Sequence, residues 1–315
     1  MVRGIVRKGG GLIVPLAVAL VAARGTGAHA EGPDATEKKE RCASRVAASL
    51  LGRGATAELL AKNDPQAEVQ NIVATPEFRE RFARFLNARF NPKPGDSPLE
   101  DATYYMAKHV LEKNLPYREM FVGKLTVVQP SEGEPAVQAN PDGLGYFRSP
   151  AWLRRYAGNE ETGLKITTAY RIMNNTVGLT LLATTNAPEA DVSATGRQAA
   201  GCRGCHYEGW FALDKAAAVL TRRRPGPEIT FDPPKGGPQT VADKSVANDA
   251  DLVRALVDSE AFEFNTCRIA FEYLYGRPES ACESTVFDRC VSTFHAKKTI
   301  QSAIVAVAAD PTFCQ

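Results

Sequence analysis

Apolar side chains between residues 75 and 90 recur every three or four positions, which is the spacing of one face of a helix. This stripe consists of Phe78, Phe82, Phe85, Leu86 and Phe90. Thr75 stands before it as a typical N-cap residue, and Pro76 occupies the first helical position, where proline is well tolerated. The pattern predicts a helix over residues 75–90 that buries its aromatic stripe in the core.

Two more segments start with a serine followed by a proline. Ser97 starts "SPLEDATYYMAKHVLEKN", where Glu100 completes the pattern of a capping box, and Ser149 starts "SPAWLRRYAG". Both segments are predicted to be helices. The apolar face of the first consists of Leu99, Ala102, Met106, His109 and Val110. Between them, residues 127–147 are rich in proline, glycine and asparagine, which predicts a short hairpin or a surface loop.

The rest of the chain also has helical periodicity, and strand-like alternation is rare. Further helices are expected over at least 168–182, over 210–224, and at 249–257, 259–275, 284–295 and 299–309. Arg222, Arg223 and Arg224 would end the second of these, where cations complement the helix dipole. We therefore predict an all-α fold, with a helical region at 31–224, a Pro/Gly-rich linker at 225–247 and a helical C-terminal module at 248–315.

Residues 1–30 have the pattern of a secretory signal peptide. Three basic residues precede the apolar run "LIVPLAVALVAA", which is too short to span a bilayer, and "AHA" at 28–30 fits the cleavage rule. No second apolar segment could span a membrane, so we expect a periplasmic or secreted protein. Cleavage would remove four basic residues and change the formal charge from +2 to −2. This leaves no basic footprint for nucleic acid.

The segment "GCRGCHYEGWF" at 201–211 carries the clearest chemical signal. Cys202, Cys205 and His206 form a CxxCH motif, in which two thiols can add to the two vinyl groups of a haem while the imidazole binds its iron. A zinc site would need two further ligands at recognisable spacing, and the chain offers only single cysteines and isolated histidines. A redox dithiol expects a strand and a helix around it, whereas the preceding residues predict a loop. The motif therefore predicts one covalently attached haem c.

The chain also resembles large bacterial families of exported proteins, mostly domains of unknown function, that combine a cytochrome-c-like motif with a C-terminal helical module. The resemblance rests on "GCRGCHYEGWFALDKAAAVL", on "LVRALVDSEAF", "FEYLYGR" and "IQSAIVAVAADPTF", and extends to "NLPYREMFVGKLTVV". It implies a helical haem protein. We interpret the chain as a cytochrome-c-like haem region at 31–224 with a small disulfide-stapled helical module after the linker. The resemblance also implies that Cys202 and Cys205 carry the thioethers and that His206 is the proximal ligand. It does not imply a reaction.

The sixth iron ligand stays open at this stage, because no methionine follows His206. The candidates are Met106, His109, Met120, Met173 and His295. Met173, in the apolar segment just before the motif, is the first choice, with a core-filling role as an equal alternative. His109 is the second choice, although a histidine on an apolar helix face is more often a core residue.

The choice of sixth ligand decides the expected function. A methionine or histidine there makes a sealed site for one-electron transfer with a redox protein partner, which is the function we predict. An open position would instead allow a haem enzyme of the peroxidase or oxygenase type. A third alternative is an envelope binding module that haem mainly stabilises. Trp210 and Phe211 would follow the ligand on one helix and wall the porphyrin, and the second ring nitrogen of His206 would donate to a carbonyl of the linker.

Five further cysteines are expected to be mostly paired in an exported protein. They are Cys42, Cys267, Cys282, Cys290 and Cys314. If the last two helices form a hairpin that turns near Lys298, Cys282 would meet Cys314 and Cys267 would pair with Cys290, although the sequence permits other pairings.

Overall fold

The computed structural model describes residues 34–95, 97–130, 133–156, 166–181, 189, 191–224, 230–234 and 236–315. The predicted signal peptide lies outside the described residues, and so do the side chains of Arg222, Arg223 and Arg224. No helix in the described part of the chain combines the length and the apolar composition needed to cross a membrane.

The described chain is mostly helical, which agrees with the predicted all-α class at the level of a mainly α fold, and it also contains three small antiparallel strand pairs that add to the helices. The helices are α1 (Ala35–Leu51), α2 (Ala57–Ala61), α3 (Val69–Ile72), α4 (Pro76–Phe90), α5 (Ala102–Glu112), α6 (Glu119–Val122), α7 (Pro150–Tyr156), α8 (Ile166–Val177), α9 (Ala200–Arg203), α10 (Leu213–Ala218), α11 (Asp249–Val257), α12 (Glu260–Tyr275), α13 (Ser284–Lys297) and α14 (Ile300–Ala308). Short 3₁₀ turns are η1 (Gln66–Glu68), η2 (Gly196–Gln198), η4 (Ala281–Glu283) and η5 (Pro311–Cys314), and η3 (Gly204–Glu208) is a π-helical turn. The strand pairs are β1 (Leu125–Val128) with β2 (Ala136–Ala139), β3 (Arg222–Arg224) with β4 (Thr230–Asp232), and β5 (Gln239–Val241) with β6 (Lys244–Val246).

The predicted helix starts are confirmed for α4 and α7. The Thr75 hydroxyl accepts the N–H of Phe78 at 3.2 Å, and the Ser149 hydroxyl accepts the N–H of Trp152 at 3.3 Å. The helix predicted from Ser97 begins later, at Ala102, because the residues between them form turns. Strands β1 and β2 confirm the short hairpin that the composition of residues 127–147 allowed.

Three expectations about residues 168–247 were wrong. Helix α8 ends at Val177 because Gly178 adopts a left-handed conformation, with φ of +71°, that ends helices efficiently. Helix α10 ends at Ala218, so Arg222–Arg224 belong to strand β3 and do not cap a helix. Strands β4, β5 and β6 all lie within 225–247, where no regular structure was expected.

The four C-terminal helices match their predicted bounds to within two residues. Helix α12 ends at Tyr275, before the left-handed Gly276, and α13 and α14 form the expected hairpin through a left-handed Lys298. The predicted Cys267–Cys290 disulfide is confirmed and links α12 to α13.

The other predicted disulfide was wrong, because Cys314 pairs with Cys42 of α1 and leaves Cys282 free and exposed. The chain end packs on α1, where the guanidinium of Arg45 lies over the Phe313 ring. This packing brings the two ends of the described chain together.

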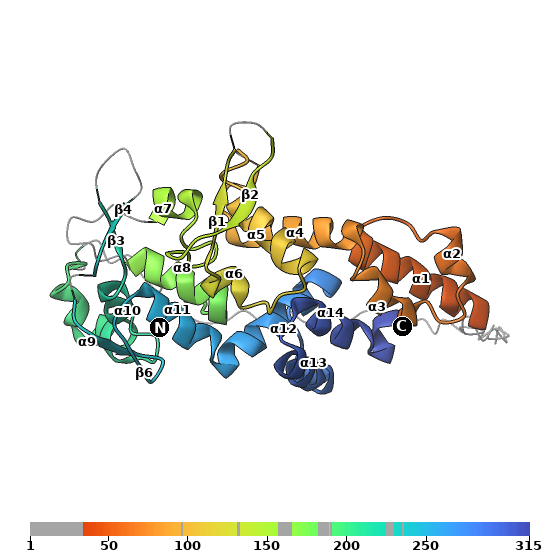
Figure 1. Ribbon diagram of the computed structural model, residues 1–315. Helices are drawn as coiled ribbons and strands as arrows, with labels where there is room; N and C mark the ends of the chain where they lie inside the picture. Colours follow the sequence, from red (N-terminus) through yellow and green to blue (C-terminus); the bar gives the residue numbers. More distant parts are fainter. Residues whose placement is uncertain are drawn as a thin grey trace, which may run out of the picture.

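The molecule is elongated, with α1–α3 and the C-terminus at one end and α9, α10 and β3–β6 at the other (Figure 1). Helix α12 runs between them and packs against both α1 and α8, and α8 in turn packs against α10 and α11. One continuous hydrophobic cluster includes buried residues from all these helices. The helices of residues 248–315 therefore share a core with those of 31–224, and their separation into a module stays a prediction.

Candidate functional site

The CxxCH motif lies on an exposed double turn at one end of the molecule (Figure 1). Cys202 belongs to α9, and Cys205 and His206 belong to the π-helical turn η3 that continues it. Both thiols are free, and Cys205 is exposed. A side-chain carbon added at Gly201 or Gly204 would meet no atom within 4 Å, so the space around the turn is open.

His206 is held by a carboxylate. Its Nδ1 lies 2.7 Å from Oδ2 of Asp214, the second residue of α10. The expectation that this nitrogen would donate to a linker carbonyl was therefore wrong. Because a carboxylate accepts, the hydrogen bond places the ring proton on Nδ1 and leaves Nε2 as the nitrogen available to a metal.

Asp214 is itself buried and firmly bonded, with only 5% of its side chain exposed. Arg197, in η2, donates from Nη2 to Oδ1 at 2.8 Å and from Nε to Oδ2 at 3.1 Å, and the Tyr207 hydroxyl donates to Oδ1 at 3.2 Å. Burial alone would raise the pKa of Asp214, but the hydrogen bonds from Arg197 and His206 outweigh it and hold the pKa below its ordinary value. The carboxylate is therefore charged at neutral pH.

The backbone between His206 and Asp214 is strained. Ala212, which is buried, has a φ of +28°, a value that side chains with a Cβ rarely adopt. The carbonyl of Trp210 accepts the N–H of Ala242, at the tip of the β5–β6 hairpin, where Ala242 and Asp243 have φ of +49° and +57°. Such strain persists only where the surroundings over-determine the conformation, and it gathers at functional sites.

Apolar side chains beside the turn are uncovered. Trp210 is 46% exposed and Val192 is 75% exposed, and these are two of the three large apolar side chains that are exposed in the described part of the chain. Trp210 and Phe211 follow η3 in a bend, so the prediction that they lie on one helix with the ligand was wrong. Their rings meet edge to face at 5.3 Å.

The five candidate sixth ligands lie on helices away from the motif or are buried in the core. Met173 on α8 and Met106 on α5 are completely buried, and Met120 on α6 is 1% exposed. His109 belongs to α5 and His295 to α13, where its Nδ1 lies 2.9 Å from a carboxylate oxygen of Glu263. Figure 1 shows α5, α6 and α13 away from α9, whereas α8 packs against α10. Of the five, Met173 thus lies on the element nearest the motif, but its thioether is enclosed.

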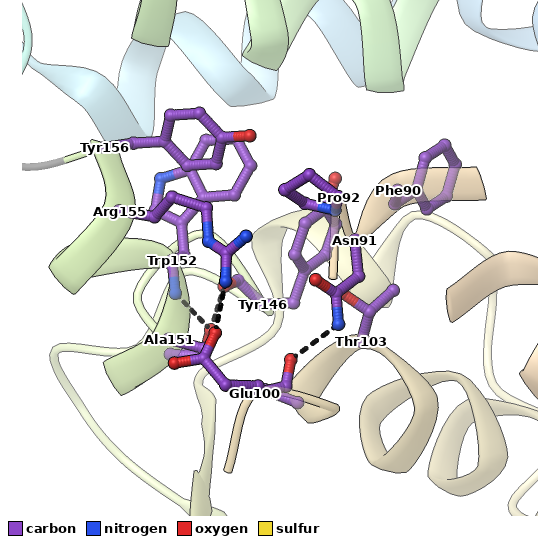
Figure 2. Close-up of a pocket in the computed structure, with 12 residues that line it drawn as sticks. Phe90, Asn91, Pro92, Glu100, Thr103, Tyr146, Ala151, Trp152, Arg155 and Tyr156 are labelled. Atoms are coloured by element: carbon purple, nitrogen blue, oxygen red, sulfur yellow. Dashed lines mark hydrogen bonds and ion pairs between the residues drawn. The ribbon is translucent and has the colours of Figure 1, made fainter. Parts of the chain in front are cut away.

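Two cavities lie away from the motif. Figure 2 shows one between α4, α5 and α7, with Arg155 bonded to Glu100 at 2.7 Å at its side. Its volume of about 20 Å³ suits a single water. A larger one of about 250 Å³ has an apolar floor that includes Phe262 and Phe294, and its Glu263 is bonded to both His295 and Lys298.

The residues of the CxxCH segment fit covalent haem. Haem iron takes four nitrogens from the porphyrin, so the chain has to supply two free thiols, an imidazole with one nitrogen free, and apolar side chains beside them. Cys202, Cys205, His206 and Trp210 meet these requirements on one short segment. Among the described residues, no group of three or more His, Cys, Asp or Glu side chains is arranged to hold a bare metal ion.

Sequence reasoning missed Asp214 and Arg197. A signal for Asp214 was present, because it is the single acidic residue in the apolar run "WFALDKAAAVL" and lies eight positions after His206. Arg197 offered no comparable signal.

Compared with models of known protein families, with curated proteins and with solved structures, the chain gives no match.

Proposed function

We propose that this protein is a c-type haem protein in which Cys202 and Cys205 carry one covalently attached haem and His206 is its proximal ligand. It exchanges single electrons with a redox protein partner outside the cytoplasm. The observation that carries the proposal is the placement of two free thiols on one exposed turn with an imidazole whose Nδ1 is already bonded. Export, which the first 30 residues predict, agrees with it.

Each residue of the segment has a distinct part in this function. Asp214 keeps the proton on Nδ1 of His206, which directs Nε2 to the iron. Trp210 and Phe211 offer apolar surface that keeps water from one side of the group. Bound haem supplies the one-electron Fe(III)/Fe(II) couple.

A second function, a haem enzyme with an open sixth position, is favoured by the burial of the methionines. For Met173 to bind iron, its thioether would have to leave a position with no exposed surface. His109 and His295 would have to come from helices that pack elsewhere. The two functions share His206 as the proximal ligand and differ only in whether a side chain would be the sixth ligand.

Haem attachment is tested by staining for haem peroxidase activity after denaturing electrophoresis, on protein from cells competent in cytochrome maturation. The wild type should stain. The double variant Cys202→Ser, Cys205→Ser should not, whereas Cys282→Ser, which removes the third free thiol, should stain like the wild type. Staining of the double variant would contradict the proposed attachment.

Electron transfer and enzyme chemistry are separated by absorption spectra with and without cyanide. A low-spin ferric spectrum that cyanide leaves unchanged is expected of an electron carrier with two axial ligands. A high-spin spectrum that shifts at once on cyanide addition would contradict the carrier and support the enzyme.

A further inference from the structure

A buried ionic network stands behind His206, and the proposed function uses only its bond from His206 to Asp214. Asp214 bridges His206 and Arg197, with each of its oxygens within 3.2 Å of the guanidinium. The Arg197 side chain is 18% exposed and that of Asp214 is 5% exposed, so solvent screens this network little. A charged aspartate in such a position needs a role that offsets the cost of burying it.

We propose that Asp214 is a positioning residue that strengthens His206 as an iron ligand, that Arg197 weakens this effect, and that the two therefore move the Fe(III)/Fe(II) equilibrium in opposite directions. The inference rests on the proposed function, because it concerns the ligand of that same site.

The direction of each effect follows from charge. A hydrogen bond from Nδ1–H to an ionised carboxylate adds electron density to the imidazole, and a more basic ligand favours the more positive metal, Fe(III). Arg197 donates to the same two oxygens and draws electron density away from His206. Loss of Asp214 should therefore favour Fe(II), and loss of Arg197 should favour Fe(III).

A matched control tests whether loss of any negative charge from the motif segment is enough to move the equilibrium. Glu208 belongs to the same turn as His206, carries the same charge as Asp214 and is exposed, and its carboxylate pairs with Arg203 at 2.6 Å. Glu208→Gln changes the net charge as Asp214→Asn does, without altering what His206 is bonded to. Because solvent screens an exposed charge, its effect on the iron should be small.

The experiment is an equilibrium redox titration of the haem-loaded full chain, followed by absorbance. Asp214→Asn should raise the Fe(II)/Fe(III) ratio at a fixed potential by about tenfold, which is about 59 mV for a one-electron couple. Arg197→Gln should lower this ratio, Asp214→Glu should restore much of the wild-type value, and Glu208→Gln should leave it nearly unchanged.

The outcomes are distinguishable. A wild type that carries no covalent haem overturns the proposed function and this inference with it. Haem present in the wild type, with Asp214→Asn and Glu208→Gln giving equal shifts, overturns this inference alone. If Asp214→Asn does not fold, Arg197→Gln decides: a lowered Fe(II)/Fe(III) ratio supports the inference, and an unchanged or raised ratio overturns it.

Discussion

The C-terminal helices α11–α14 and the motif segment, residues 191–221, are built on different principles. The helices have continuous apolar faces that are buried, and the Cys267–Cys290 disulfide links two of them. The motif segment consists of short helices and turns, contains strained Ala212 and exposes Trp210. Its helix α10 packs into the core against α8, whereas the turns before it are joined to α10 by a polar network around Asp214. The difference teaches that burial stabilises the helices, whereas the turns of the motif are arranged to present chemical groups.

The largest contrast should appear when one aromatic ring is removed from each region. Phe271, in α12, is completely buried, so Phe271→Ala should lower the free energy of unfolding by about 3–5 kcal/mol. Trp210→Ala should cost about 1 kcal/mol or less in the haem-free protein, because nearly half of the side chain is exposed. Urea unfolding followed by circular dichroism measures both. Equal losses for the two variants would contradict the proposed difference between the regions.

Removal of the disulfide in the helical region should have the next largest effect. The double variant Cys267→Ser, Cys290→Ser should lose about 2–4 kcal/mol of unfolding free energy, because the unfolded chain is no longer constrained by the crosslink. Cys282→Ser is the control and should change the stability by less than about 0.5 kcal/mol, since that thiol is free and exposed. A double variant as stable as this control would show that the disulfide is not what stabilises the region.

A smaller, pH-dependent effect is expected at the start of α13. Glu283 is bonded to Arg277 and completes a capping box with Ser280, and these bonds lower its pKa from 4.5 to about 2. Because the folded pKa is depressed, its contribution is fully present above about pH 4.5 and disappears as the pH falls toward 2. Glu283→Gln should therefore be less stable than the wild type at pH 7, by about 1 kcal/mol or less, and equally stable near pH 2. A stability difference that does not change between these pH values would refute this assignment.

The smallest effect should come from relief of strain near the motif. Ala242 is left-handed at the β5–β6 turn, a conformation that asparagine tolerates better. Ala242→Asn should raise the melting temperature slightly, by the equivalent of about 0.5 kcal/mol. Thr240→Asn, on strand β5 of the same hairpin, serves as control and should give no gain. A gain in both variants would assign the effect to asparagine itself and not to the turn.

Hydrophobic periodicity predicted the fold well where burial determines the helix. Helix α11 has the predicted bounds, and α4 begins at Pro76 as its N-cap indicated. Strands β3–β6 were missed because three residues show too little alternation to be recognised, whereas β1 and β2 form the short hairpin that the composition allowed. The end of α8 could have been predicted, because Gly178 is a standard helix stop signal.

Contacts between distant residues could not be read from the sequence. The cysteines of the Cys42–Cys314 disulfide are 272 positions apart, and their pairing depends on how the chain end packs on α1. At the motif, the residue types predicted Cys202, Cys205 and His206, but the bond from His206 to Asp214 depends on a strained turn that leaves no periodic pattern. The haem itself stays a prediction from these residues.

The most direct test of the central proposal is the intact mass of the protein after expression in a cell competent in cytochrome maturation, denaturation and extraction with acid acetone, which removes haem that is not covalently bound. The account predicts a coloured polypeptide heavier than the mature chain by one haem, and loss of this added mass in the Cys202→Ser, Cys205→Ser variant. A colourless wild-type protein with the mass of the bare polypeptide would contradict it.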